Sequence, residues 1–375
     1  MLAGWHRRPE AAITVYSTTV GAHVCENYHY ELPLRVVSGR TIDFARDPVV
    51  GFLRRLLSAI RLALCVPAPE IVYSNSLYFY DLLPTLLLRF RRRKTKVIVP
   101  VFHLVAPPRK RRGSLIINVL AYVEQRAMLR LVPFFADIVI TADASLAQEL
   151  PKLRRRDAHV VVTDMGVHNQ PAPRFSRDQH DAIYVGRLTS VKGMAELLDA
   201  WAMVVKSLPS AELALIGNAA GEFDPTSAVR KRNLERNVKL YHDVSDEALH
   251  AHLRASKIFI TASREEGYGI TMLDALAEGV PCVSFDLPVF RSAFPYGRVF
   301  PKTMSPEGLA GCAIRLLTDS DEYARLQNEI RQEYRFKTWG QVSEQLWDSC
   351  VSPMLACSHA RSSKVARPSS SRPSQ

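Results

Sequence analysis

Two stretches in the second half of the sequence combine cations, glycines and carboxylates in patterns that suit an anionic, hydroxyl-rich ligand. The first stretch, Tyr184–Gly193, carries Arg187 and Lys192 between a predicted strand and a predicted helix. A planar guanidinium beside a mobile ammonium is a suitable pair for neutralising a diphosphate. The alternative is a pair of solvated surface cations. We treat Gly186, Arg187 and Lys192 as candidate ligand-binding residues.

The second stretch, Ser263–Pro281, predicts a strand, a glycine-containing turn and a helix. The turn and the first helical residues are Glu266, Gly267, Tyr268, Gly269, Ile270 and Thr271. Glycines permit close backbone approach, and a helix N-terminus presents N–H groups that favour phosphate. Glu266 and Asp274, eight positions apart, suit sugar hydroxyls rather than phosphate. The alternative is that Glu266 caps the helix and Asp274 faces solvent.

Two residues of the first half are further candidates. His103 follows a buried strand, where an imidazole can donate a hydrogen bond to a sugar hydroxyl or shuttle a proton. A purely structural histidine is the alternative. Gly21 follows the first strand and marks either a tight turn near a ligand phosphate or only a turn.

The elements that must position these residues alternate between short β-branched runs and amphipathic stretches. Strands are predicted at 11–19, 32–38, 70–75, 96–102, 137–142 and 159–164, then at 181–186, 211–217, 237–242, 257–262 and 280–285. Helices are predicted at 47–65, 78–90, 114–132 and 143–150, then near 192–206, 226–235, 245–255, 270–278 and 305–317. Near-continuous apolar strands separated by helices predict parallel sheets covered on both faces.

A proline-containing polar segment at 168–178 interrupts this alternation and predicts a domain boundary. The expected fold is α/β, with two doubly wound Rossmann-like domains facing a cleft. The domains are 1–172 and 173–335, followed by a helix at 336–357 that packs back toward the N-terminal domain and a disordered tail at 358–375. Ligands of open parallel sheets bind beyond the carboxyl ends of the strands, so the cleft is the expected site.

With these motifs in place, residues 181–300 resemble the GT-B glycosyltransferases of the family-4 (glycosyl transferases group 1) type. The family's Gly-Arg-Leu-x-x-x-Lys-Gly motif is matched from Gly186 to Gly193. Its Ser-x-x-Glu-Gly-Phe/Tyr-Gly motif is matched from Ser263 to Gly269. The second carboxylate of the family is usually Glu, and here it is the shorter Asp274. Over 1–172 the resemblance is weaker, because the usual double-glycine turn is reduced to Val20-Gly21-Ala22.

The resemblance implies transfer of a sugar from a UDP- or GDP-sugar donor, with retention at the anomeric carbon and with no metal or cofactor. It implies that Arg187 and Lys192 neutralise the diphosphate and that backbone N–H groups from Tyr268 to Thr271 hold the phosphates. It also implies that Asp274 binds the ribose, while Glu266 and His103 contact the donor sugar from opposite domains. The implied acceptor is a lipid-linked or cell-envelope glycan.

Charge is uneven along the chain. The whole sequence has 49 Lys and Arg against 37 Asp and Glu, and residues 1–172 alone hold 24 against 13. Ten of these cations and no acid lie between Arg89 and Arg112, next to the uncharged stretch Gly113–Val123. A basic cluster beside an apolar helix predicts contact with an anionic membrane surface. We expect a cytoplasmic protein bound peripherally to the membrane; a core helix with a solvated basic loop is the alternative.

Other features restrict the class of protein. No apolar run reaches the length of about 18 residues that a membrane span needs, and Met1–Ser17 is not predicted to be a secretory signal. The six cysteines form no C-x-x-C pair, so neither a disulfide framework nor structural zinc is expected. A nucleotide-sugar epimerase on the same fold and a non-enzymatic protein that binds an anionic polymer stay open. Nucleic acid is not expected, because stacking aromatics do not interleave with the cations.

Overall fold

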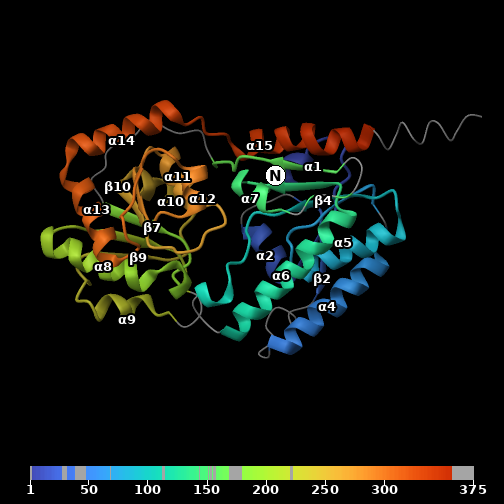
Figure 1. Cartoon of the computed structure of the whole chain (residues 1–375), viewed down its shortest axis with the longest axis horizontal. Helices are drawn as coiled ribbons and strands as arrows, with labels where there is room; N and C mark the ends of the chain where they lie inside the picture. The colour runs from blue at the N-terminus through green and yellow to red at the C-terminus, as the bar shows by residue number, and fades with distance from the viewer. Residues whose placement is uncertain are drawn as a thin grey trace, which may run out of the picture.

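A computed structural model describes residues 2–27, 32–38, 48–67, 69–111, 115–142, 144–150, 152, 154, 158–168, 180–219 and 223–356. The predicted tail at 358–375 lies outside these residues, as does the predicted boundary at 168–178 apart from His168. Figure 1 shows two α/β halves side by side, with α15 (Trp339–Leu346) lying over the N-terminal half. The domain limits themselves stay predictions.

The N-terminal half contains two parallel sheets within the described residues. One has the strand order β3 (Ile71–Tyr73), β4 (Lys96–Pro100), β5 (Ile138–Thr141) and β6 (His159–Val162). The other pairs β1 (Val15–Thr18) with β2 (Leu34–Ser38). β5 is buried along its whole length, as is β4 from its second residue onward, which explains their continuous apolar sequences. All six predicted strands are confirmed.

The helices of this half are α1 (Leu2–His6), α2 (Thr19–Asn27), α4 (Pro48–Cys65), α5 (Phe79–Arg91), α6 (Leu115–Phe135), α7 (Ala144–Glu149) and the 3-10 turn η1 (Pro108–Lys110). The four predicted helices are confirmed within about three residues. α1 and α2 were not predicted. In α2 the apolar residues Val20, Ala22 and Val24 alternate as they would in a strand, so the sequence lacks a helical period.

The C-terminal half has one six-stranded parallel sheet of order β12-β11-β10-β7-β8-β9. Its strands are β7 (His180–Val185), β8 (Leu213–Ile216), β9 (Val238–Tyr241), β10 (Ser256–Thr261), β11 (Cys282–Ser284) and β12 (Arg298–Val299). The five predicted strands are confirmed, and β12, at two residues, is too short to be predicted from its pattern. β7 and β10 are central neighbours, so the segments that follow them meet at the same edge of the sheet.

The helices of this half are η2 (Ser190–Lys192), α8 (Met194–Ser207), α9 (Pro225–Arg230), α10 (Asp246–Arg254), α11 (Ile270–Ala277), α12 (Pro288–Ala293), α13 (Pro306–Thr318) and α14 (Ser320–Glu333). The predicted helix at 226–235 is too long, because the chain leaves the helix after Arg230 and Asn233 has a φ of 56°. α14 was missed because it is mostly polar and buries few apolar side chains, among them Leu326 and Ile330.

The C-terminal helical segment packs back on the N-terminal half, as predicted. Thr338 and Gln341 form a capping box that starts α15, which continues into η3 (Trp347–Val351). Leu346 and Trp347 lie in one buried cluster with Trp5 and with residues of β4 and β5. The Trp5 indole N–H also donates to the Ser343 carbonyl at 2.8 Å. The C-terminal segment therefore belongs to the core of the N-terminal half.

Candidate active site

The carboxyl ends of β7 and β10 bring the two predicted donor motifs together. Lys192, at the end of η2, lies within 2.7 Å of the Glu266 carboxylate, Nζ to Oε1. Both side chains are about one-fifth exposed, so this ion pair is shielded but still reachable from solvent. The alternative in which Glu266 caps the following helix is wrong, because Gly269 occupies the N-cap of α11 and no side chain caps it.

A left-handed glycine fixes the contact between these loops. Gly193 has a φ of 71°, and a Cβ there would overlap the carbonyl oxygen of Ala262 at the end of β10. No other residue could hold the loop this close. Gly193 also ends η2 and starts α8, so it sets the position of Lys192 one residue earlier.

Arg187 occupies the start of the same loop. Its carbonyl accepts a hydrogen bond from the Tyr184 hydroxyl at 3.2 Å, and the next residue, Leu188, forms a bridge with Ala219 beyond β8. These contacts fix the backbone while the Arg187 side chain is exposed. Burial raises the pKa of Tyr184, and the nearby Glu266 charge raises it further, so the phenol stays protonated as a donor.

The turn before α11 presses against the N-terminal half. A Cβ on Gly267 would lie 3.0 Å from the Phe102 carbonyl oxygen and 3.1 Å from the Cβ of His103. Gly269 follows with a φ of 101° and lets α11 begin at Ile270. The predicted phosphate-binding segment, Tyr268 to Thr271, thus forms the start of α11 beside His103.

Asp274 lies one turn inside α11 and is buried, so the alternative in which it faces solvent is wrong. Its Oδ1 has no hydrogen-bond partner within the described residues. Burial raises the pKa of Asp274 to about 6, although the nearby His250 opposes this. His250 in turn lies 3.0 Å from Glu278, Nδ1 to Oε1, and this contact raises the pKa of the imidazole. A buried carboxylate oxygen without a partner is an acceptor for a ligand hydroxyl.

His103 faces the C-terminal half, but its partner there was not predicted. His103 Nε2 lies 2.9 Å from Oε1 of Glu265, the neighbour of Glu266. The other Glu265 oxygen, Oε2, accepts from Arg111 Nε at 2.9 Å. Burial alone would raise the pKa of Glu265, but the hydrogen bonds from His103 and Arg111 outweigh it and lower the value to about 2. The paired glutamates in the sequence were the only signal for this residue.

Two neighbouring residues of α6 hold the loops of the N-terminal half from behind. The buried Gln125 accepts from the Val105 N–H at 2.7 Å and donates to the His103 carbonyl at 2.9 Å. Glu124 accepts from the Phe79 N–H at 3.0 Å, at the start of α5. The loops after β3 and β4 are therefore tied to the same turn of α6, and sequence analysis missed both contacts.

Gly21 does not form the predicted tight turn. It lies in the first turn of α2, which begins directly after β1. The helix replaces the loop because Thr19 follows the strand without an intervening turn residue. Among the described residues, no group of three or more His, Cys, Asp or Glu side chains could hold a metal ion.

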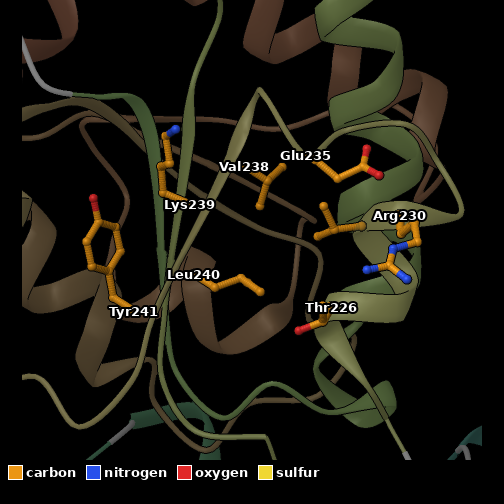
Figure 2. Close-up of a pocket in the computed structure, with 8 residues that line it drawn as sticks. Thr226, Arg230, Glu235, Val238, Lys239, Leu240 and Tyr241 are labelled. Atoms are coloured by element: carbon orange, nitrogen blue, oxygen red, sulfur yellow. The ribbon is translucent and has the colours of Figure 1, made fainter.

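An open cavity lies elsewhere, between α9 and β9 at the far edge of the six-stranded sheet. Figure 2 shows Val238 and Leu240 directed into it, with Thr226 and Arg230 on the opposite wall. β9 is an edge strand, separated from β10 by β8 and β7. The cavity contains none of the predicted site residues.

Comparison with solved structures defines the class of fold. The chain superimposes on Anabaena Alr3699/HepE, whose structure is a complex with UDP and glucose, with a TM-score of 0.68, 17% identity and coverage of 93% of this chain and 94% of that chain. It matches sucrose-phosphate synthase from Thermosynechococcus elongatus with a TM-score of 0.67, 16% identity and coverage of 86% and 84%. The fold is GT-B, with two Rossmann-like domains facing each other.

Sequence comparison then identifies the family of the C-terminal half. Residues 168–333 match the family model described as Glycosyl transferases group 1, so this part of the chain is a glycosyl transferases group 1 domain. The chain is 29% identical to mannosylfructose-phosphate synthase of Agrobacterium fabrum, over 46% of this chain and 40% of that protein. It is 26% identical to phosphatidyl-myo-inositol mannosyltransferase of Mycobacterium tuberculosis, over 46% and 47%. The chain thus spans less than half the length of these relatives.

Proposed function

We propose that the chain is a retaining glycosyltransferase that moves a sugar from a nucleotide-diphosphate donor to a glycan or lipid-linked acceptor. The observation that supports this most is the meeting of three motifs at one edge: the Lys192–Glu266 pair, the start of α11, and His103 from the opposite half. Such a site combines positive charge for a leaving diphosphate with polar groups for a sugar. The family match of the C-terminal half supports the same chemistry.

In the proposed reaction, the bond between the donor sugar and the diphosphate breaks while negative charge develops on the leaving phosphate. The acceptor oxygen bonds to the same anomeric carbon, and the acceptor proton passes to the leaving diphosphate. Lys192 and Arg187 stabilise that charge, together with the N–H groups at the start of α11. Glu266 keeps Lys192 directed into the site until the diphosphate arrives. A site of this kind needs no metal ion to neutralise the leaving group.

The hydroxyl groups of the donor are assigned to acceptors near that edge. The unpaired Oδ1 of Asp274 is available to a ribose hydroxyl that reaches into α11. His103 packs against Gly267, the residue that follows Glu266, and both side chains are assigned to the donor sugar. The solved complex of Anabaena Alr3699/HepE contains UDP and glucose, which supports a nucleotide-sugar donor here.

A donor panel tests this proposal. The purified chain is incubated with UDP- and GDP-sugars, with and without membrane extract, and nucleotide release and labelled products are measured. We expect acceptor-dependent nucleotide release from one donor class. A sugar product formed from donor alone, without transfer, would instead identify an epimerase. Absence of turnover with every donor, while an anionic polymer binds, would favour a binding protein.

We further propose that the enzyme is peripheral to the cytoplasmic face of a membrane and that its acceptor is lipid-linked. The first two turns of α6 expose an apolar face, in which Ile116 is 73% and Leu120 64% exposed, with Val119 and Val123 beside them. α6 begins at the cleft edge of the sheet, because it follows the loop after β4. An acceptor held in a bilayer there would lie close to the donor site. Within the described residues, no helix is both long enough and apolar enough to span a bilayer.

The basic region from Arg89 to Arg112 is not a single surface, which corrects the simplest form of this prediction. β4 separates its two groups, so they lie at opposite ends of one strand. Several of the cations also have internal partners. Arg91 donates to the Ala63 and Val66 carbonyls at the end of α4, Lys96 pairs with Asp137, and Arg111 pairs with Glu265.

The membrane test therefore uses the apolar face. Replacing Ile116 and Leu120 by Ser should release the protein from anionic liposomes, since burying each such side chain contributes about 1.5–3 kcal/mol. Co-sedimentation with vesicles containing anionic lipid measures the effect, and Leu57→Ser on the exposed side of α4 is the control. Unchanged co-sedimentation of the α6 variant would contradict a membrane contact at this face.

A further inference from the structure

The two glutamates that precede Gly267 have different partners. Glu266 pairs with Lys192 inside the C-terminal half, whereas Glu265 contacts only the N-terminal half through its carboxylate in the contacts described above. Its Oε1 lies 2.9 Å from His103 Nε2 and 3.4 Å from the Ala106 amide nitrogen. Its Oε2 accepts from Arg111 Nε at 2.9 Å. Both carboxylate oxygens of Glu265 thus form hydrogen bonds with residues of the N-terminal half.

We propose that Glu265 is a positioning residue that holds the imidazole of His103 in one tautomer and one orientation toward the donor sugar. The proposal rests on the proposed function, because the assigned partner of His103 is the donor sugar. Glu265 itself contacts no donor atom in this account. It acts through His103, and it does so from the opposite half of the molecule.

The chemistry of the pair fixes the tautomer. An ionised carboxylate can only accept hydrogen bonds, so the Nε2 that faces it must carry the proton. A neutral His103 then has its lone pair on Nδ1, which can accept a hydrogen bond from a sugar hydroxyl. The low pKa of Glu265 agrees with an ionised carboxylate at neutral pH.

Arg111 makes this arrangement differ from a simple carboxylate–imidazole pair. In general a lone carboxylate beside an imidazole favours the imidazolium form, in which both ring nitrogens can only donate. The guanidinium of Arg111 shares the same carboxylate and offsets its charge. The charged groups that face His103 and Glu265 in the described contacts are Arg111 and, one residue further along, the Glu266–Lys192 pair.

The backbone around His103 has supports besides the 3.4 Å contact from the Ala106 N–H to Glu265, so the main role of Glu265 is to orient the ring. Gln125 fixes the His103 carbonyl and the Val105 N–H, and Gly267 packs against the His103 Cβ. Removing the Glu265 carboxylate should therefore leave the loop in place while the ring loses its orientation. A misplacement of about 1 Å at a reacting centre can reduce turnover about 100-fold.

The activity test compares Glu265→Gln, His103→Ala and the double variant. The Gln amide can either accept or donate toward His103, so the tautomer is no longer fixed. We expect Glu265→Gln to lower kcat by about 10-fold to 100-fold, with the donor KM changed by less than about 3-fold because the diphosphate contacts remain. The double variant should be no slower than His103→Ala. Asp164→Asn is the matched control, because it breaks another ion pair of the N-terminal half, to Lys337 of the C-terminal segment at 2.6 Å.

A second readout does not depend on turnover. In the wild-type protein, ¹⁵N NMR of labelled histidine should show His103 as the Nε2–H tautomer, and Glu265→Gln should convert it to a mixture. Inactivity of the wild type with every donor would refute the proposed function, while this spectrum would still test the positioning. The positioning role is refuted by an unchanged tautomer in Glu265→Gln. It is also refuted if the double variant loses the product of both single effects, or if Glu265→Gln turns over like Asp164→Asn.

Discussion

The loops of the two halves reach the same site but are held in place by different means. In the C-terminal half, Gly193 and Gly269 adopt left-handed conformations, and each is packed so closely that a Cβ would collide with a neighbour. In the N-terminal half, the loop after β4 is held by side chains from distant parts of the chain, chiefly Gln125 of α6 and Glu265 of the other half.

This difference suggests a division of roles. A loop fixed by its own backbone keeps its shape whether or not the halves are in contact. The His103 ring, which Glu265 orients, has its complete geometry only when the halves meet. In the proposed function the diphosphate contacts therefore belong to the C-terminal half, whereas the donor sugar needs both Glu266 and the oriented ring of His103.

The largest expected effect on turnover comes from the cations of the C-terminal half that are assigned to the diphosphate. Lys192→Ala and Arg187→Ala should each reduce turnover by about 2–4 kcal/mol of transition-state stabilisation, with little loss of stability. Lys192→Ala should be the more severe, because it also leaves Glu266 without its cation. Steady-state kinetics and thermal melting measure the two properties. Lys206→Ala, on the exposed side of α8, should turn over like the wild type.

Near-normal turnover of both variants would show that the diphosphate binds elsewhere.

Asp274 should make stability depend on pH. Burial raises its folded-state pKa to about 6 from an ordinary 3.8, so ionisation is disfavoured in the folded chain. This cost is absent below the unfolded pKa, grows as pH rises from about 4 to 6, and is complete above 6, at roughly 3 kcal/mol. Asp274→Asn should therefore raise the Tm at pH 7.5 and have little effect at pH 4.

Donor affinity should depend on the ionisation of Asp274 in the opposite direction from stability: it should be higher above pH 6 than below. The ionised carboxylate accepts stronger, charge-assisted hydrogen bonds from donor hydroxyls than the protonated acid does, so donor affinity should fall as pH drops below about 6, by up to about 10-fold per pH unit. Asp274→Asn should bind donor weakly at every pH. An equal pH dependence of donor affinity in Asp274→Asn and in the wild type would contradict the assignment.

Glycine substitutions test the claim about backbone geometry. Gly269→Ala should destabilise the fold by at least about 2 kcal/mol, since it combines a strained φ with a Cβ placed 2.6 Å from Phe290. Gly311→Ala is the control: that glycine lies inside α13 with nothing within 4 Å of its Cβ, and Ala there should stabilise by about 0.5–1 kcal/mol. Denaturant unfolding of both variants gives the comparison, and equal stabilities would contradict it.

The smallest effect is expected from chelation. Because Lys192, Arg187 and the start of α11 are assigned to the diphosphate, turnover should persist in EDTA. If EDTA abolished turnover and added Mg²⁺ or Mn²⁺ restored it, a metal ion rather than these side chains would neutralise the diphosphate.

The positions that sequence analysis found and missed follow the same division. The strand–loop–helix units around Lys192 and Glu266 were predictable, because glycine turns and helix starts leave local signals. Asp274 was found by spacing, but its burial depends on packing against α10 and could not be read from the sequence. Glu265, Arg111 and Gln125 were missed, since nothing local connects residues whose contacts span 20 to 162 positions.

The N-terminal half shows a second limit of sequence analysis. The basic residues from Arg89 to Arg112 are close in sequence, but β4 places them at opposite ends of a strand, and Arg91 and Arg111 bind partners inside the protein. A run of like charges predicts a surface only if no element crosses the molecule between its members. Gly21 was misassigned for a related reason, since α2 begins without a turn.

Hydrogen exchange with and without a donor tests the central claim most directly, because the site is assigned to both halves. With UDP-glucose or GDP-mannose, whichever turns over, we expect protection of 186–193 and 263–271 together with the loop at 101–107. In Glu265→Gln the protection at 186–193 should remain, because the residues assigned to the diphosphate are unchanged. Protection confined to the cavity between α9 and β9, or absent from both sets of loops, would contradict the account.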